Sequence, residues 1–357
     1  MTDRRRVNAP SGGTKPPVFA PLPFSKGSTV WHRPTRQRQS NELRKTFLKT
    51  GLTPSASGSA YLELESPLPS DPSKSSLLPS TSALKLTCAV HGPKPLPRSA
   101  PFTPNVLLST HIKFSPFAGR HRRGYIRDFT ERDLAVNLET ALRGVIIGDR
   151  WPKSGVEVVI TVLEGEEDHW WGDESVRGSS GLSGCGMMNI LAGCITVASA
   201  AIIDAGIDCV DLISGGVAAV VSSEGEGHDT SQSKTKIKSG LGKRQQIMLD
   251  PSPSDHEFIS AACVVGFLPT RQEITELWVK GDLSGDQTRI MTNGSTSQSL
   301  FDELVDGAIG AALGIGAVLG EAVKEAAVHK AKRQGVDFEP TSDPRQVAEP
   351  RDTEMRG

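Results

Sequence analysis

The sequence predicts an α+β protein built from two β-α units, each packing a sheet against helices. Residues 58–64 and 84–90 alternate small or apolar with polar side chains, as strands with one buried face do. Residues 156–163 are mostly apolar and predict a buried strand. Helical segments lie among these strands, and this mixture is typical of layers in which sheets pack against helices.

The first two strand segments are expected to pair as a β-hairpin with one buried face. Gly92 and Pro93 end the second of them. Their connection, residues 66–82, is rich in Ser and Pro and too long for a tight turn. It is therefore predicted to be a disordered insertion at the tip of the hairpin.

Changes in composition divide the rest of the chain. Residues 1–40 are predicted to be a disordered basic arm, residues 41–333 the folded domain, and residues 334–357 a charged, disordered tail. Two further insertions are expected inside the domain. Residues 164–183 combine an acidic run with Trp, Gly and Ser, and residues 222–245 are rich in Gly, Ser and Lys without an apolar period. Both are predicted to be surface loops.

Overall composition favours an intracellular protein with a sizeable core. At 357 residues the chain can bury one large core or two small ones. The basic N-terminus has no apolar stretch behind it, so neither a signal peptide nor a transit peptide is expected. Five cysteines without a CxxC pair fit a reducing compartment. Packing is preferred over metal binding for the four that lie in apolar patterns: Cys88, Cys194, Cys209 and Cys263.

The formal net charge of −1 hides a basic N-terminal region. Residues 1–50 carry eleven Lys and Arg side chains against Asp3 and Glu42 alone. A basic, Pro-rich arm of this kind is expected to be drawn to nucleic acid by its charge.

The last apolar segment, residues 300–333, predicts a long helix with many glycines. Its uncharged part lies between Asp306 and Glu321, which is shorter than the roughly 20 residues that a membrane span needs. A packed soluble helix is therefore preferred, with no membrane as partner. The basic residues at its end suit a helix C-terminus.

Four short motifs follow one another along the chain: the strand 58–63, the strand end 85–93, the basic loop 115–124 and the Leu-Asp-Pro at 249–251. This order and spacing resemble the ribonuclease PH family, and within it one branch of the ring-forming subunits of the eukaryotic RNA exosome. The resemblance spans roughly residues 39–333.

The same resemblance implies several further elements. A helix is expected from Glu131 through Arg143, and a buried helix at 200–207 is followed by a strand near 211–213. An apolar strand is expected over residues 261–268.

Active members of the family hold inorganic phosphate on a glycine-rich turn at a helix N-terminus, together with a hydroxyl and an arginine. The resemblance aligns that turn with residues 188–193. Ile190 and Leu191 then stand where the hydroxyl and the guanidinium are needed. Asn189, Ile190, Leu191 and Ala192 are therefore predicted to be a degenerate phosphate site, a helix start that packs in the core.

The family also places a catalytic Asp at the start of a late strand, and the best match here is Ala261, which offers no carboxylate. An alternative is a relocated acid-base or metal site formed by Asp255, His256 and Glu257. Because adjacent side chains on a turn diverge, a solvated loop is preferred for these three residues. No metal and no cofactor are expected.

The basic loop holds the best candidates for binding RNA. A loop of this composition can track a phosphate backbone while an aromatic side chain, here Tyr125, stacks on a base. The alternative is an ordinary solvated loop, but the resemblance implies that the loop faces the central pore of a ring, so RNA contact is preferred. The candidates are Arg120, His121, Arg122, Arg123 and Arg127.

The resemblance implies a catalytically inert subunit of the exosome core ring, which supports 3′-to-5′ RNA processing and decay by an associated nuclease. Expected partners are other ribonuclease PH-like subunits in a six-membered ring, cap subunits with RNA-binding domains, a hydrolytic nuclease subunit and RNA. The expected location is the nucleus and nucleolus, and also the cytoplasm. The alternatives are an active phosphate-dependent 3′-to-5′ exoribonuclease and a free RNA-binding module without a ring.

Overall fold

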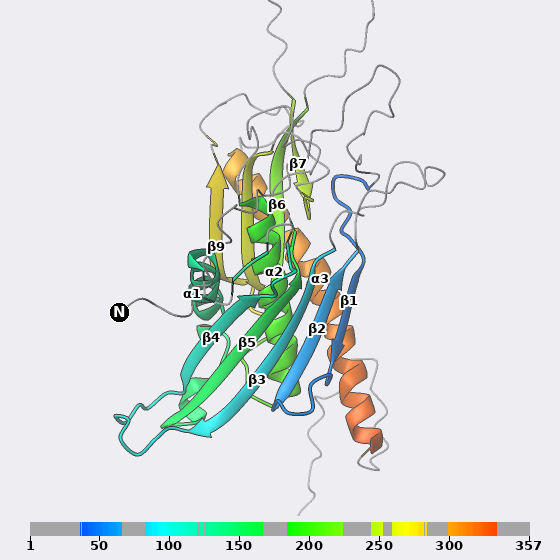
Figure 1. Cartoon of the computed structure of the whole chain (residues 1–357). Coiled ribbons are helices and arrows are strands. Elements are labelled where there is room, and N and C mark those ends of the chain that lie inside the picture. The colour runs from blue at the N-terminus through cyan, green and yellow to red at the C-terminus, as the bar shows by residue number, and fades with distance from the viewer. Residues whose placement is uncertain are drawn as a thin grey trace, which may run out of the picture.

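The computed structural model describes residues 36, 38–65, 83–119, 122–124, 126, 128–166, 184–223, 244–252, 259–281, 283 and 299–333. Within them the chain forms two sheets, a long helix between the sheets, and one helix on either side (Figure 1). This agrees with the predicted α+β class and its two units.

The first sheet has the order β1-β2-β3-β5-β4. All neighbours are antiparallel except β4 and β5, which run parallel and are joined through helix α1 and a short 3-10 turn. A parallel pair needs such a crossover connection. The strands are β1 (Thr46–Thr50), β2 (Gly58–Leu64), β3 (Lys85–Pro95), β4 (Leu107–Phe114) and β5 (Ser154–Glu164), and the turn is η1 (Gly148–Arg150).

The predicted hairpin is the antiparallel pair β2 and β3. Ala60 lies opposite Cys88 and Leu62 opposite Leu86, and all four side chains are buried. Alternation of apolar and polar residues put one face of each strand into the core, so the register follows from the sequence pattern. The expected insertion at residues 66–82 lies outside the described residues.

The second sheet has the order β7-β6-β8-β9 and is antiparallel throughout. The prediction of a loop over residues 222–245 was wrong at both ends, because Ser223 of β6 pairs with Arg244 of β7. A backbone ladder can continue into residues without an apolar period, since its hydrogen bonds come from the main chain. The strands are β6 (Ser214–Ser223), β7 (Arg244–Leu249), β8 (Ile259–Leu268) and β9 (Glu273–Gly281).

Helix α2 (Cys185–Asp204) lies between the two sheets and is buried along nearly its whole length (Figure 1). Glycines in both sheets permit the close approach. A Cβ on Gly58 would lie 2.4 Å from the carbonyl oxygen of Ala201, and one on Gly215 would lie 2.3 Å from that of Ala192. The glycine that opens the first motif is therefore required by helix packing.

Helix α1 (Phe129–Arg143) covers β4, and it begins two residues before the predicted start and ends where predicted. Asp128 and Glu131 form a capping box. Glu131 is fully buried, and its carboxylate also accepts hydrogen bonds from the Phe114 backbone N–H at 3.0 Å and the Lys113 ammonium at 3.0 Å. This acid therefore ties the start of α1 to the end of β4.

Helix α3 (Leu300–Arg333) has the predicted bounds and packs on β6 and β8 through one face. Both α2 and α3 are long and apolar enough to cross a membrane by length and composition. In α2, 89% of an apolar 18-residue stretch is buried inside the protein, as expected for a core helix. In α3, 28% of the corresponding stretch is buried. The buried face of α3 consists of Leu304, Ala308, Ala311, Ala312 and Leu319.

Candidate functional site

The predicted degenerate phosphate site, residues 188–193, lies inside α2 and not on a turn at its start. The helix begins at Cys185, after Gly184 in a left-handed conformation. The Met188 backbone N–H already bonds to the Gly184 carbonyl, and the following N–H groups point along the helix to the carbonyls four residues earlier. This backbone therefore does not cradle an anion at these positions.

The side chains at the degenerate positions pack in the core. Ile190 and Leu191 are fully buried and Ala192 is nearly so. Ile190 also lies beside Gly165, where a Cβ would be 3.4 Å from its Cδ1 atom. An apolar side chain thus fills the space next to the end of β5, and neither position offers a hydroxyl or a guanidinium.

Asn189 differs from its neighbours because its buried side chain is polar. Its amide nitrogen donates to the Glu166 carboxylate and, at 2.7 Å, to the Pro251 carbonyl oxygen. Both partners are acceptors, so the amide nitrogen must face them and the oxygen must point away. Asn189 Oδ1 is buried and has no hydrogen-bond partner in the described part of the chain.

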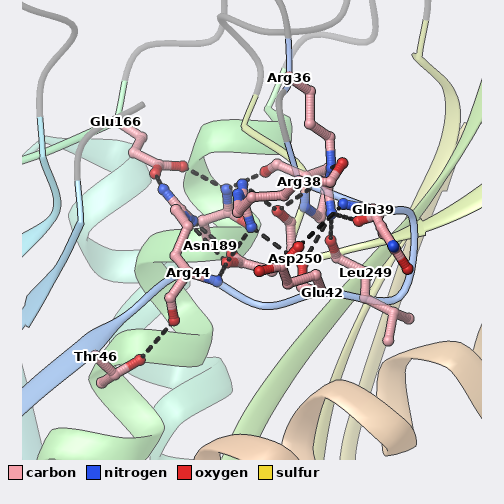
Figure 2. Close-up of polar contacts among 11 residues, drawn as sticks. Arg36, Arg38, Gln39, Glu42, Arg44, Thr46, Glu166, Asn189, Leu249 and Asp250 are labelled. Carbon is pink, nitrogen blue, oxygen red and sulfur yellow. Dashed lines mark hydrogen bonds and ion pairs between the residues drawn. The ribbon is translucent and has the colours of Figure 1, made fainter. Parts of the chain in front are cut away.

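Next to Asn189 lies a buried ionic cluster centred on Arg44 (Figure 2). The Arg44 guanidinium donates to Asp250 from two nitrogens, at 2.9 Å and 2.6 Å, and pairs with Glu166 through a third. The Arg44 backbone N–H also donates to Asp250, at 2.9 Å. One cation thus joins two carboxylates that come from the end of β7 and the end of β5.

Two further arginines hold the preceding segment against the same place. Arg36 donates to the backbone carbonyls of Leu249 at 2.9 Å and Asp250 at 3.3 Å, and Arg38 pairs with the Asp250 carboxylate at 3.4 Å (Figure 2). The Leu249 N–H bonds to the Ser40 carbonyl at 2.8 Å. The end of the predicted arm is therefore bound to β7, and the expectation of disorder up to residue 40 was wrong for these residues.

Asp250 has a left-handed backbone, with φ at 47°. Burial would raise the pKa of its carboxyl group, but the nearby Arg44 guanidinium outweighs burial and lowers that pKa to about 2. Asp250 is therefore ionised at neutral pH. The Leu-Asp-Pro motif at a strand end acts here as an anchor for Arg44.

Glu166 was expected in a surface loop of residues 164–183, and this was wrong at the start of that range. Glu164 is the last residue of β5, and Glu166 is 7% exposed. Its acidic, Gly- and Ser-rich surroundings carry no sequence signal for burial. The charge of Arg44, 122 residues away in the sequence, makes the buried carboxylate possible.

Ala261, the position predicted to correspond to the family's catalytic Asp, does not lie in the cluster around Arg44 and Asn189. Ala261 belongs to the apolar cluster on the α3 side of β8, together with Leu304 and Ala308. Ala262, the next residue, belongs to the core cluster that contains α2. Because side chains alternate along a strand, a carboxylate facing α2 would have to stand at position 262 and not at 261.

In the basic loop, Arg122 and Arg123 differ in their surroundings. Arg122 is exposed. Arg123 lies over the Phe114 ring at 4.0 Å from its centroid, donates to Thr130 Oγ1 at 3.3 Å and is 3.8 Å from the Asp128 carboxylate. The remaining candidates, Arg120, His121 and Arg127, lie outside the described residues, as does Tyr125.

The alternative site of Asp255, His256 and Glu257 also lies outside the described residues. Among the residues that are described, no group of three or more His, Cys, Asp or Glu side chains is arranged to hold a metal ion. Burial raises the pKa of Cys88 and Cys194 far above the usual range, and that of Cys263 to about 12. These thiols therefore remain protonated at neutral pH and pack as apolar groups.

Comparison with known proteins gives one consistent result. Residues 42–208 match the RNase PH family, described as 3′ exoribonuclease family, domain 1. The chain is 49% identical to the exosome complex component MTR3 of Chaetomium thermophilum over 82% of this chain and 91% of that protein.

More distant relatives carry the same name. The chain is 26% identical to the exosome complex component mtr3 of Schizosaccharomyces pombe, over 82% of this chain and 89% of that one. It is 25% identical to the exosome complex component MTR3 of Homo sapiens, over 78% of this chain and 84% of that protein. The crystal structure of rice (Oryza sativa) Rrp46 has the same fold, with a TM-score of 0.52 and 15% identity, covering 81% of this chain and 98% of that one.

Proposed function

Since this chain belongs to the ribonuclease PH family, in the group of exosome components called MTR3 (mRNA transport regulator three), we propose that it is a non-catalytic ring subunit of the RNA exosome. It pairs with other ribonuclease PH-like subunits and lines part of an RNA path. The RNA is processed or degraded from its 3′ end by a separate nuclease.

The observation that carries this proposal is the 49% identity to an exosome component over 91% of that protein's length. The match is not confined to one motif, since it extends over 82% of this chain. Described apolar side chains at strand edges and on α1 remain exposed and fit such neighbours, among them Phe47 on β1, Leu277 on β9 and Phe129 on α1.

The absence of catalysis is supported by the degenerate site. Phosphorolysis needs a donor set for inorganic phosphate next to the scissile bond. Here Ile190 and Leu191 are apolar and buried, and the Arg44 guanidinium, which shares the partner Glu166 with Asn189, is bound to two carboxylates of the chain itself. Removing one electrostatic element of an active site typically costs about a hundredfold in rate, and groups that act as a unit fail together.

The RNA path is proposed to run along the basic loop at Arg120, His121, Arg122, Arg123 and Arg127. Exposure of Arg122 and of Phe117, which is 74% exposed at the base of the same loop, favours contact with a flexible strand. The remaining partners of the proposal are cap subunits with RNA-binding domains and a hydrolytic nuclease subunit. Its location is the nucleus, the nucleolus and the cytoplasm.

Co-expression followed by native mass determination tests the assembly. The full-length chain alone is expected to be poorly soluble or self-associating, because its exposed apolar edges lack their neighbours. With the other ribonuclease PH-like subunits it should form a defined hetero-oligomer. A stable, monodisperse monomer that ignores those subunits would count against the proposal and favour a free RNA-binding module.

An RNA-shortening assay tests the absence of activity. The purified chain should release no nucleoside diphosphates from single-stranded RNA in the presence of phosphate and magnesium. Phosphate-dependent shortening that is lost on Asn189→Ala would establish the alternative, an active phosphorolytic exoribonuclease.

A further inference from the structure

The Glu166 carboxylate occupies the place in the degenerate site where an oxyanion could bind. One of its oxygens pairs with the Arg44 guanidinium, and the other accepts the Asn189 amide N–H. A guanidinium and an amide N–H converging on two oxygens of one group are the donors by which proteins hold carboxylates and phosphates. Glu166 and Asn189 are both buried.

The main chain directs Glu166 into this place. The Gly165 N–H donates to the Ala118 carbonyl oxygen at 2.8 Å, which holds the turn after β5 against the base of the basic loop. Ile190 packs against the same turn from the helix side. The carboxylate is therefore delivered to Arg44 and Asn189 by a backbone that has contacts on two sides.

Asn189 also lines a small cavity, which Glu166 does not line. Asn189 Oδ1 has no partner in the described part of the chain, and Asn189 lines a cavity of about 20 Å³ together with Thr196 and Asp250. A volume of this size holds about one water molecule. The surroundings of Asn189 are thus not closed by apolar packing alone.

We propose that Arg44 and Asn189 form an anion-binding site that the chain fills with its own Glu166, and that this site takes inorganic phosphate once the carboxylate is removed. Charge favours this outcome. Arg44 pairs with both Glu166 and Asp250, and Arg38 also pairs with Asp250, so loss of Glu166 removes one of the two carboxylates that pair with Arg44. The inference rests on the proposed function, which interprets residues 189–192 as a degenerate phosphate site. Its test uses no RNA and no ring assembly.

The test compares Glu166→Ala with wild type and with Glu164→Ala in the full-length chain. Glu164 is the matched control, because it lies two residues away and also loses a cationic partner, Lys85, but at the surface. Thermal unfolding is followed in phosphate and in chloride of equal ionic strength. Phosphate stabilises any folded protein to some extent by exclusion from its surface, so the difference between the variants is what counts.

We expect about 50 mM phosphate to raise the melting temperature of Glu166→Ala by about 3 °C more than that of wild type or Glu164→Ala. Inorganic phosphate should also show broadening of its ³¹P resonance with Glu166→Ala only. Glu166→Gln should not respond, since the amide fills the same space. Equal responses of all variants to phosphate, with no selective broadening, would overturn the proposal.

A folding defect in Glu166→Ala does not prevent the test. If the variant is insoluble, it is refolded in phosphate and in chloride of equal ionic strength. Selective recovery in phosphate supports the site, and equal or absent recovery in both overturns it. A failure of ring assembly or of RNA binding would affect the proposed function and leave this result unchanged.

Discussion

The basic segment before β1 and the basic loop after β4 look alike in sequence, yet their arginines meet different surroundings. Arg36, Arg38 and Arg44 bind carbonyl and carboxylate oxygens of their own chain around Asp250 (Figure 2). In the loop, Arg122 is exposed, and Arg123 is held by Phe114 and Thr130. A run of arginines therefore does not by itself predict a nucleic-acid surface, because a carboxylate from elsewhere in the fold can bind them first.

The largest difference should appear between two adjacent residues, Arg44 and Lys45. The Arg44 side chain is 2% exposed and that of Lys45 is 87% exposed. Arg44→Ala leaves two buried carboxylates without their cation and should lower the free energy of unfolding by about 3–5 kcal/mol. Lys45→Ala should change it by less than about 0.5 kcal/mol. Urea denaturation of both variants measures this, and similar losses would contradict an internal role of Arg44.

A second expected effect is acid sensitivity through Asp250. Its pKa is lowered from 3.8 to about 2 in the folded chain, so the folded state favours the ionised form. This stability is present above the unfolded pKa and is lost as pH falls toward 2. The loss should be roughly 2 kcal/mol between about pH 5 and pH 2.

Denaturation of wild type and Asp250→Asn across this pH range provides the measurement. The variant should be less stable at neutral pH. Its free energy of unfolding should also fall less steeply between about pH 5 and pH 2, because the contribution of Asp250 is missing. An unchanged slope would show that the carboxyl group is not held by Arg44 in solution.

The basic loop should respond mainly in RNA binding. Replacing Arg120, Arg122 and Arg123 together by Glu is expected to weaken RNA binding by the assembled ring about tenfold at low salt, because backbone contacts are lost and repulsion replaces them. The effect should shrink as salt rises. Titration with labelled single-stranded RNA at several salt concentrations measures it.

Ring assembly by the triple variant should be intact, and the double change of Asp255 and Glu257 to Ala serves as a control without a comparable effect. Unchanged RNA binding by triple-variant rings would make the loop an ordinary solvated surface.

The smallest effect should separate the two described arginines of the loop. Arg123→Ala loses the contact with the Phe114 ring and should cost roughly 0.5–1 kcal/mol of stability. Arg122→Ala should leave the midpoint of unfolding unchanged, because its side chain is exposed. Equal midpoints for the two variants would mean that the ring contact does not persist in solution.

Elements with a strong local pattern could be predicted from the sequence. The pair β2 and β3 follows from alternation, and the bounds of α3 follow from a long apolar run with charged ends. The edge strands β1 and β9 were not predicted, because they are only partly buried and their patterns lack a consistent apolar face. Short strands at the edge of a sheet depend on pairing with a neighbour more than on their own side chains.

The candidate site was predicted in part. Ile190 and Leu191 were expected to pack in the core, and the structure places both there. Glu166 and the role of Arg44 were missed, because each looks like a solvated charge in its local sequence. The structure adds that Ala261 packs on the α3 side of β8 while Ala262 packs on the α2 side, since strand alternation turns a shift of one residue into the opposite face.

The sequence by itself determined the family, the two units and the apolar character of Ile190 and Leu191, because these depend on local periodicity and on motifs in a set order. Only the tertiary structure decided which charges are internal. Arg44, Glu166 and Asp250 are far apart along the chain, and a buried charge is stable only when a partner of opposite sign meets it in the folded state. These three side chains come together only when β5, β7 and α2 pack against one another, and no local sequence pattern predicts that packing.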